Sequence, residues 1–231
     1  MSDPANPSGA LPGDPRYGLS EQELKQYYMT KSPSWCIQAR LRADGGAEAR
    51  VSAADPHLAY LREHRDRIRF AGPLLSDDGA ETTGSLTLLD APDRASAEAW
   101  IASEPFNMAG AFDAVEIVRW SSSMEIRQLD YPRTVDWQQF IVTAIDGPDA
   151  DARRAAVAED HHKFQASLMD RYVARGPLQD DDGSRLIGSF MIMEFPDRAA
   201  CEDFWAKEPL NYGGVFKDVT IERWRWGKGI G

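Results

Sequence analysis

The distribution of apolar and polar residues predicts the same elements in each half of the chain. Runs rich in apolar residues, typical of buried strands, cover 36–42 and 84–90 in the first half and 139–145 and 188–195 in the second. A Gly/Asp-rich loop follows the first run of each half, and an Asp-Asp-Gly turn signal precedes the second run. Each half therefore contains at least two strands, separated by a longer segment.

The segment between these strands has apolar residues at helical spacing. In the first half the predicted helix opens near Ser52, and in the second it runs from about Asp151 to Val173. A Gly-Pro-Leu block follows each helix, and we expect it to stop the helix and start another strand, because proline cannot continue a helix. The apolar positions are Leu58, Leu61 and Ile68 in the first helix, and Ala155, Phe164, Leu168 and Tyr172 in the second.

A second helix and a final strand complete each half. Pro-Asp-Arg opens helices at 93–103 and 197–207, and a Glu-Pro pair ends them. A last strand then runs to Trp120 or Trp224. The predicted order is β-α-β-β-α-β, which is ferredoxin-like.

The two halves are copies of one sequence. Residues 36–120 align with residues 140–224 without a gap, and the identities fall in blocks, which indicates an internal duplication. One polar match, His57 with His161, stands alone in an otherwise divergent stretch. The identical blocks are Gly72-Pro73-Leu74, Asp77-Asp78-Gly79, Gly84-Ser85, Pro92-Asp93-Arg94-Ala95, Glu104-Pro105-x-Asn107 and Arg119-Trp120 with their counterparts.

This duplication predicts an α+β fold in which two ferredoxin-like repeats pack sheet to sheet as a barrel within one chain. A four-stranded sheet with both helices on one face leaves its other face bare, and a tandem copy can cover it. The predicted domains are 1–34, a flexible arm (1–18) with a short capped helix (20–28); 35–120, the first repeat; 121–136, a linker; and 137–231, the second repeat.

Charge and composition exclude several classes of partner. The net charge is −11 and no Lys/Arg stripe stands out, which argues against nucleic acid and against an anionic membrane surface. The chain has no long apolar run and its N-terminus lacks a secretory signal pattern, so we expect a cytoplasmic protein. Cys36 and Cys201 occupy non-equivalent positions and are expected to be buried, reduced thiols.

Histidine and glutamate recur as candidates for acid–base chemistry. His57 and His161 occupy equivalent positions near the start of the first helix, each close to acidic residues, and histidine titrates near neutral pH. Glu104 and Glu208 can orient the imidazole rings or act as the second acid–base group. Two other interpretations stay open: the histidines can be polar residues of a solvated helical turn, and Glu-Pro-x-Asn can be a structural turn.

Further residues are candidates for substrate binding: Asp55, Asn107, Asn211, Trp120 and Trp224. For the two tryptophans, packing at an edge of the sheet is the alternative. We expect no metal site, because adjacent histidines do not share a helix face and no Cys or His completes a ligand set.

Each half resembles the YCII-related (YciI-like) family of the dimeric α/β-barrel superfamily. The similarity rests on 55–61 (DPHLAYL), 70–74 (FAGPL), Gly84-Ser85, 97–100 (AEAW) and 104–110 (EPFNMAG), with the Gly-Pro-Leu, Gly-Ser and Glu-Pro-Leu-Asn-Tyr-Gly-Gly parts repeated in the second half. The resemblance implies a ferredoxin-like fold and a His–Asp site, with the histidine at His57 and His161.

The chain departs from the family pattern at three points. The aspartate falls on Glu104 and Glu208, Leu210 replaces an aromatic residue in the second copy, and the arginine common before the family histidine is absent at Ala54 and Ala158. Relatives in the superfamily include a dehydrochlorinase and a muconolactone isomerase of aromatic catabolism.

The functional hypothesis is a cofactor-independent lyase or isomerase that acts on a small cyclic carbonyl, lactone or hydroxylated aromatic compound through the histidines. The alternative is a non-catalytic module that binds a small ligand or another protein. The expected partner is a small-molecule substrate, and the tandem unit can form a homodimer.

Overall fold

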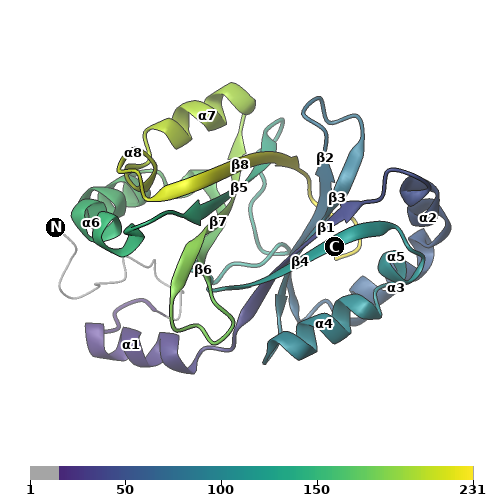
Figure 1. Ribbon diagram of the computed structural model, residues 1–231, viewed down its shortest axis with the longest axis horizontal. Coiled ribbons are helices and arrows are strands. Elements are labelled where there is room, and N and C mark those ends of the chain that lie inside the picture. Colours follow the sequence, from purple (N-terminus) through teal and green to yellow (C-terminus); the bar gives the residue numbers. More distant parts are fainter. Residues whose placement is uncertain (1–15, 231) are drawn as a thin grey trace.

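The computed structural model describes residues 16–230 and contains the predicted β-α-β-β-α-β order twice (Figure 1). The first copy comprises β1 (Ser34–Leu41), α2 (Gly46–Ser52), α3 (Ala54–Glu63), β2 (Ile68–Leu75), β3 (Thr82–Asp90), α4 (Arg94–Ala102), α5 (Pro105–Met108) and β4 (Phe112–Trp120). The second comprises β5 (Gln138–Asp146), α6 (Ala150–Ser167), the 3₁₀ turn η1 (Met169–Arg171), β6 (Tyr172–Gln179), β7 (Leu186–Phe195), α7 (Arg198–Ala206), α8 (Pro209–Tyr212) and β8 (Phe216–Trp224).

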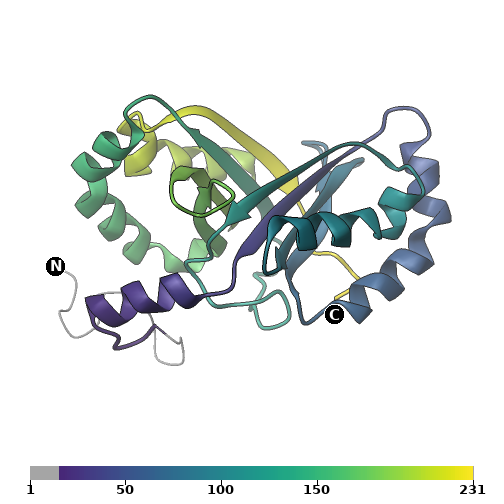
Figure 2. The same ribbon diagram turned by 60° about the horizontal axis from the view of Figure 1, so that its bottom comes forward.

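The eight strands close into one barrel in the order β1-β3-β2-β8-β5-β7-β6-β4. The two sheets face each other in the middle of the molecule, and the helices of each repeat cover the outer side of their own sheet (Figures 1 and 2). The predicted packing of two sheets within one chain is therefore confirmed. Two short antiparallel contacts join the repeats: Leu74 with Trp224 and Leu75 with Arg223, and Arg119 with Gln179 and Trp120 with Leu178.

The space between the sheets is filled by large side chains from both repeats. Trp120 and Trp224 are 0% and 1% exposed, and the Trp120 ring lies edge-on to the Phe190 ring at a centroid distance of 6.3 Å. Residues that end the last strand of one repeat thus pack against the sheet of the other. Their burial reflects the assembly of the whole barrel, because neither repeat could bury them alone.

Blocks that are identical in the two repeats lie where the repeats meet. A Cβ at Gly72 would overlap the carbonyl oxygen of Arg225, and one at Gly176 would overlap that of Ser121. The segment that follows the last strand of each repeat therefore passes directly over the Gly-Pro-Leu block of the other, and only glycine leaves room for it.

The Asp-Asp-Gly turns also contact the opposite repeat. Arg223 donates to the carbonyl oxygen of Asp77 at 3.1 Å, and Arg119 donates to that of Asp181 at 3.1 Å. Arg94, from the first Pro-Asp-Arg block, adds an ion pair with Asp181 at 2.7 Å. These repeated blocks are therefore explained by the junction between the repeats.

Three details of the sequence interpretation are wrong. The helix predicted to reach Val173 ends at Ser167, and Tyr172 begins β6, where it is 1% exposed and packs against Phe204. In the first repeat the helix begins earlier, at Gly46, and is interrupted at Ala53. Pro56 explains this break because it cannot donate to the carbonyl oxygen of the preceding turn; Asp160 stands in its place in the continuous α6.

The Gly-Pro-Leu blocks lie inside β2 and β6 and do not start them. Pro73 is tolerated there because β2 pairs only with β3 at this point, and its pairing with β8 begins at Leu74. On that side the carbonyl oxygen of Pro73 accepts from the backbone N–H of Arg225 at 3.3 Å, so this edge uses Pro73 as an acceptor and does not need its missing donor.

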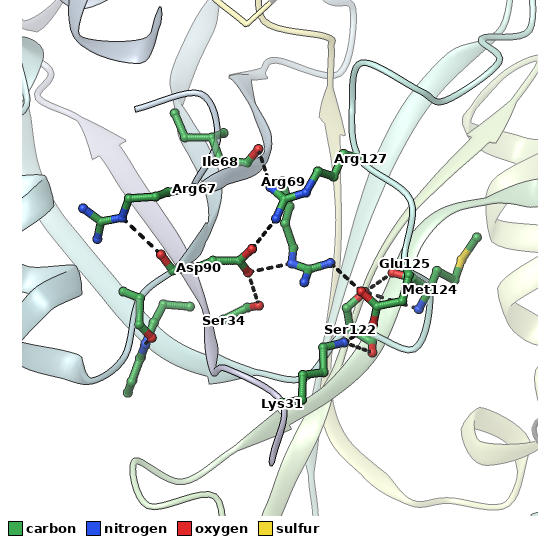
Figure 3. A network of polar contacts seen from close by, with 12 residues as sticks. Lys31, Ser34, Arg67, Ile68, Arg69, Asp90, Ser122, Met124, Glu125 and Arg127 are labelled. Carbon is green, nitrogen blue, oxygen red and sulfur yellow. Dashed lines mark hydrogen bonds and ion pairs between the residues drawn. The ribbon is translucent and has the colours of Figure 1, made fainter. Parts of the chain in front are cut away.

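The helix α1 (Glu21–Thr30) precedes the first repeat and has the predicted capping box at Ser20 and Glu23. The predicted flexible arm, 1–18, lies almost wholly outside the described residues. Lys31, just after α1, donates to the carbonyl oxygen of Ser122 at 2.9 Å and forms an ion pair with Glu125 (Figure 3). Tyr27 donates to the same carboxylate at 2.8 Å, so α1 is attached to the segment after β4.

Arg69 connects this segment to the first repeat. Its guanidinium bonds Glu125 at 3.2 Å and Asp90 at 2.6 Å, and Asp90 also accepts from Ser34 at 2.6 Å and from Arg127 at 2.5 Å (Figure 3). Burial would raise the pKa of Glu125, but its bonds to Lys31 and neighbouring charges hold the pKa below its usual value. The start of the linker is thus fixed on the first repeat.

No helix in residues 16–230 is long and apolar enough to cross a membrane.

Candidate functional site

His57 and Glu104 come together in the first repeat. The Nδ1 atom of His57, on α3, lies 2.5 Å from Oε1 of Glu104, and the two side chains are 19% and 4% exposed. Glu104 ends the segment after α4 and caps α5, because its Oε2 accepts from the backbone N–H of Asn107 at 3.2 Å. The Glu-Pro-x-Asn block is therefore a helix cap, and the same carboxylate also contacts a histidine.

The second repeat has the same arrangement. Nδ1 of His161, on α6, makes a short hydrogen bond with Oε1 of Glu208, whose other oxygen accepts from the backbone N–H of Asn211 at 3.1 Å. Glu208 is 2% exposed. The spacing of elements in the duplicated fold thus positions two His–Glu pairs in equivalent places.

A carboxylate on Nδ1 fixes the tautomer of the imidazole and leaves Nε2 for a ligand. Such a ring can accept a proton at Nε2, because the carboxylate stabilises the imidazolium that forms. The arrangement is therefore suited to general acid–base chemistry.

The first pair lies in the wall of a cavity of about 190 Å³ between the helices of the first repeat and its sheet. His57, Leu58 and Leu61 line it from α3, and the opposite wall includes Trp226, which follows the last strand of the second repeat. A cavity of about 150 Å³ can hold benzene, so this one matches a compound with a single ring.

The second pair lines an equivalent cavity of about 340 Å³. Its walls include Ser123, from the segment after the last strand of the first repeat. Each cavity is thus completed by the other repeat. The residues that line both cavities and are identical in the two repeats are Arg50, Ala54, His57, Gly72, Pro73, Ser85, Glu104 and Phe112, with Arg154, Ala158, His161, Gly176, Pro177, Ser189, Glu208 and Phe216.

Sequence reasoning missed the arginine and serine of this set. Nη1 of Arg50 donates to Oγ of Ser85 at 2.7 Å, and Nη2 of Arg154 donates to Oγ of Ser189 at 3.3 Å. The signal was available, since Arg50 matches Arg154 within a stretch where nearly every neighbour differs. Arg50 lies one helical turn before Ala54, the position where the family arginine is absent.

The aromatic residue after Glu104 distinguishes the two sites. The rings of His57 and Phe106 stack at a centroid distance of 3.7 Å and an angle of 15°, and the Arg50 guanidinium lies 4.3 Å from the centroid of the same phenyl ring. In the second repeat Leu210 replaces Phe106, and the ring nearest to His161 is that of His162, at 5.6 Å. Burial, with the charges of His161 and Arg175, lowers the pKa of His162.

The structure places the remaining predicted site residues outside the cavity linings. Asp55 is exposed on the first turn of α3, while Asn107 and Asn211 act through their backbone N–H groups as described above. Trp120 and Trp224 lie in the barrel core, as described above, and line neither cavity.

The described residues contain no group of three or more His, Cys, Asp or Glu side chains arranged to hold a metal ion. Cys36 and Cys201 are free and buried.

Fold and site together define a tandem α/β-barrel protein with one His–Glu cavity in each repeat. The YCII-related domain model matches residues 35–121 and 139–225, so the chain belongs to the YCII-related family.

Relatives with one repeat match about a third of the chain. An uncharacterized protein of Haemophilus influenzae is 29% identical over 90 residues, which are 36% of this chain and 92% of the relative. The solved structure of 5-chloro-2-hydroxyhydroquinone dehydrochlorinase from Burkholderia phenoliruptrix is 27% identical, with a TM-score of 0.35, and the match covers 38% of this chain and 93% of the enzyme.

Structures that match both repeats share the fold at low identity. Chlorite dismutase from Candidatus Nitrospira defluvii has a TM-score of 0.56 at 9% identity, over 87% of this chain and 94% of its own. A putative monooxygenase from Lactobacillus acidophilus has a TM-score of 0.51 at 10% identity, over 84% of this chain and 94% of its own. They show that this chain has the dimeric α/β-barrel fold.

Proposed function

We propose that this protein is a cofactor-independent lyase or isomerase that moves a proton on a small cyclic carbonyl, lactone or hydroxylated aromatic compound. The observation that carries the proposal is the 2.5 Å contact between His57 Nδ1 and Glu104 Oε1 in the wall of a mainly apolar cavity. A histidine held in this way is the ordinary group for proton transfer at neutral pH.

In the proposed reaction, Nε2 of His57 takes a proton from a carbon next to the carbonyl group, and Glu104 stabilises the imidazolium. In an isomerisation the imidazolium returns that proton to another atom of the same enolate. In an elimination the enolate expels an anionic leaving group, and the imidazolium later loses its proton to water. Both routes balance without an oxidant or a reductant.

Proton exchange tests this proposal before any product is known. Proton NMR in D₂O would follow the loss of exchangeable C–H signals from a panel of small lactones, cyclic ketones and catechols. We expect His57→Asn to slow exchange by about a hundredfold or more, since a general base contributes roughly that much. The His57→Asn, His161→Asn double variant should be inactive.

His64→Asn is the matched control, because His64 packs on Tyr60 and lines neither cavity. It should exchange at the native rate. Unchanged exchange in the double variant would rule out the histidines as the base. Compounds that bind without exchange would instead favour a ligand-binding module.

A further inference from the structure

The first cavity carries an excess of positive charge in an acidic protein. Arg50, Arg225 and Lys228 line it, and among the described residues in its walls Glu104 is the one carboxylate. The chain as a whole has a net charge of −11. Because Glu104 is bound to His57, three cations face a single carboxylate that already has a partner.

Arg50 has no acidic hydrogen-bond or ion-pair partner among residues 16–230. Its contacts there are the hydroxyl of Ser85 and the ring of Phe106, and its side chain is half-buried. Burial lowers the pKa of Arg50, and the nearby charge of Arg225 acts in the same direction, against the attraction of Glu104. A guanidinium without a carboxylate has free donors for a planar anion.

The second repeat provides an internal contrast at the same position. Arg154 forms an ion pair with Asp146, with Nη2–Oδ1 and Nε–Oδ2 distances of 2.6 and 3.2 Å. The residue equivalent to Asp146 in the first repeat is Arg42, which is exposed and donates to the carbonyl oxygen of Asp44. The same arginine is therefore neutralised in one cavity and left unneutralised in the other.

The C-terminal segment presents the other two cations on a fixed backbone. Gly227 donates to the carbonyl oxygen of Ala71 at 3.0 Å and accepts from the side chain of Gln128 at 3.1 Å. Ile230 is buried among the residues under the helices of the first repeat, and the yellow segment after β8 runs toward those helices (Figure 2). The residues equivalent to Arg225 and Lys228 are Ser121 and Met124, which are uncharged, and the residue of that segment in the wall of the second cavity is Ser123.

From these contacts we infer that the first cavity binds a small anion, a single-ring compound that bears a carboxylate, with the carboxylate on Arg50 and the ring against Phe106 and Trp226. This inference rests on the proposed function, because it names the charge of the compound on which His57 acts. Arg225 and Lys228 add attraction at the cavity wall. In the second cavity Arg154 is paired with Asp146 and Arg175 is a further cation in the wall, so we expect a weaker preference for an anion there.

Matched carboxylates and carboxamides test the inference: benzoate with benzamide, 4-hydroxybenzoate with 4-hydroxybenzamide, and 2-furoate with 2-furamide. NMR titration of the native protein gives the dissociation constant of each compound and shows whether His57 or His161 signals respond. We expect the carboxylates to bind at the first site about tenfold or more tightly than their amides, and this preference to shrink as salt rises.

Arg50→Gln should weaken carboxylate binding by about tenfold or more and leave the amides nearly unchanged, and Arg50→Lys should restore part of the loss. Arg154→Gln is the matched control and should leave carboxylate binding at the first site unaltered. The inference is overturned if no carboxylate binds at millimolar concentration, if each amide binds as well as its acid, or if Arg50→Gln leaves the preference intact.

His57→Asn separates this inference from the proposed function. If the carboxylates still bind to His57→Asn with the native preference and the preference is lost in Arg50→Gln, the anion site stands, whatever the exchange experiment shows. If exchange of the lactones, ketones and catechols depends on His57 but each amide binds as tightly as its acid, the anion site fails and the proposed function stands.

Discussion

The two cavities hold their histidines in the same way but surround them differently. In the first, His57 stacks on Phe106, and Arg50 has no carboxylate partner among the described residues. In the second, Leu210 replaces the phenyl ring and Arg154 is bound to Asp146. The comparison teaches that duplication preserved the His–Glu pair and allowed the residues around it to diverge.

Blocks at the junction between the repeats are unchanged, whereas some residues of the cavities differ. The blocks Gly-Pro-Leu, Asp-Asp-Gly and Arg-Trp are the same in both repeats, and each contacts the opposite repeat. A junction residue is constrained by two partners at once, because the barrel closes through both contacts. Phe106 and Leu210, which differ between the cavities, pack on residues of their own repeat and are free of this double constraint.

The largest expected effect is a loss of proton exchange when the carboxylate of the first His–Glu pair, but not that of the second, is replaced. Glu104→Gln has one oxygen, which can cap α5. The uncharged amide group that remains for His57 cannot stabilise an imidazolium as the carboxylate does. We expect proton exchange to fall about a hundredfold or more, as in His57→Asn, because the ring loses the carboxylate that fixes its tautomer and stabilises its imidazolium. Glu208→Gln, the matched variant, should change exchange less than twofold. The exchange rates in D₂O of both variants measure this, and an equal loss in the two would show that the repeats share the reaction.

The second-largest expected effect is a loss of stability when a glycine at the junction of the repeats is replaced, and it is expected in both repeats alike. Gly72→Ala and Gly176→Ala place a methyl group on a carbonyl oxygen of the opposite repeat, so each should lower the free energy of unfolding by about 3 kcal/mol. Urea unfolding measures the loss. Gly147→Ala is the control, since its added Cβ would meet its nearest neighbours at 3.4 Å, an ordinary contact. Native stability in either junction variant would contradict the close approach.

Much of the fold and the central pair could be predicted from the sequence, because those features are local or repeated. The order of strands follows from apolar patterns and turn signals, and the pairing of His57 with Glu104 follows from their recurrence in both repeats. Periodicity failed at Tyr172, because an apolar residue at helical spacing fits equally well at the start of a buried strand.

The rest depends on contacts between the repeats, which no local pattern reveals. Trp120 and Trp224 were candidates for a pocket, but the opposite sheet buries them. Residues 225–229 lie beyond the aligned repeat, so nothing in the alignment placed Arg225 or Lys228 beside Arg50. The cavity is a product of barrel closure as much as of either repeat.

The smallest expected effect is the change in stability and in NMR shifts when the aromatic residue that distinguishes the cavities is exchanged. Phe106→Leu removes the ring stacked on His57 and should lower the free energy of unfolding by about 1 kcal/mol, the size of one aromatic contact. It should also remove the ring-current shift of the His57 signals in the proton NMR spectrum, which a general loss of stability would leave in place. Leu210→Phe is the reverse exchange, and it should create such a shift at His161. If the His57 signals keep their positions in Phe106→Leu, the stack does not hold the ring in solution, and the difference between the two cavities must rest on Arg50 and Arg154 alone.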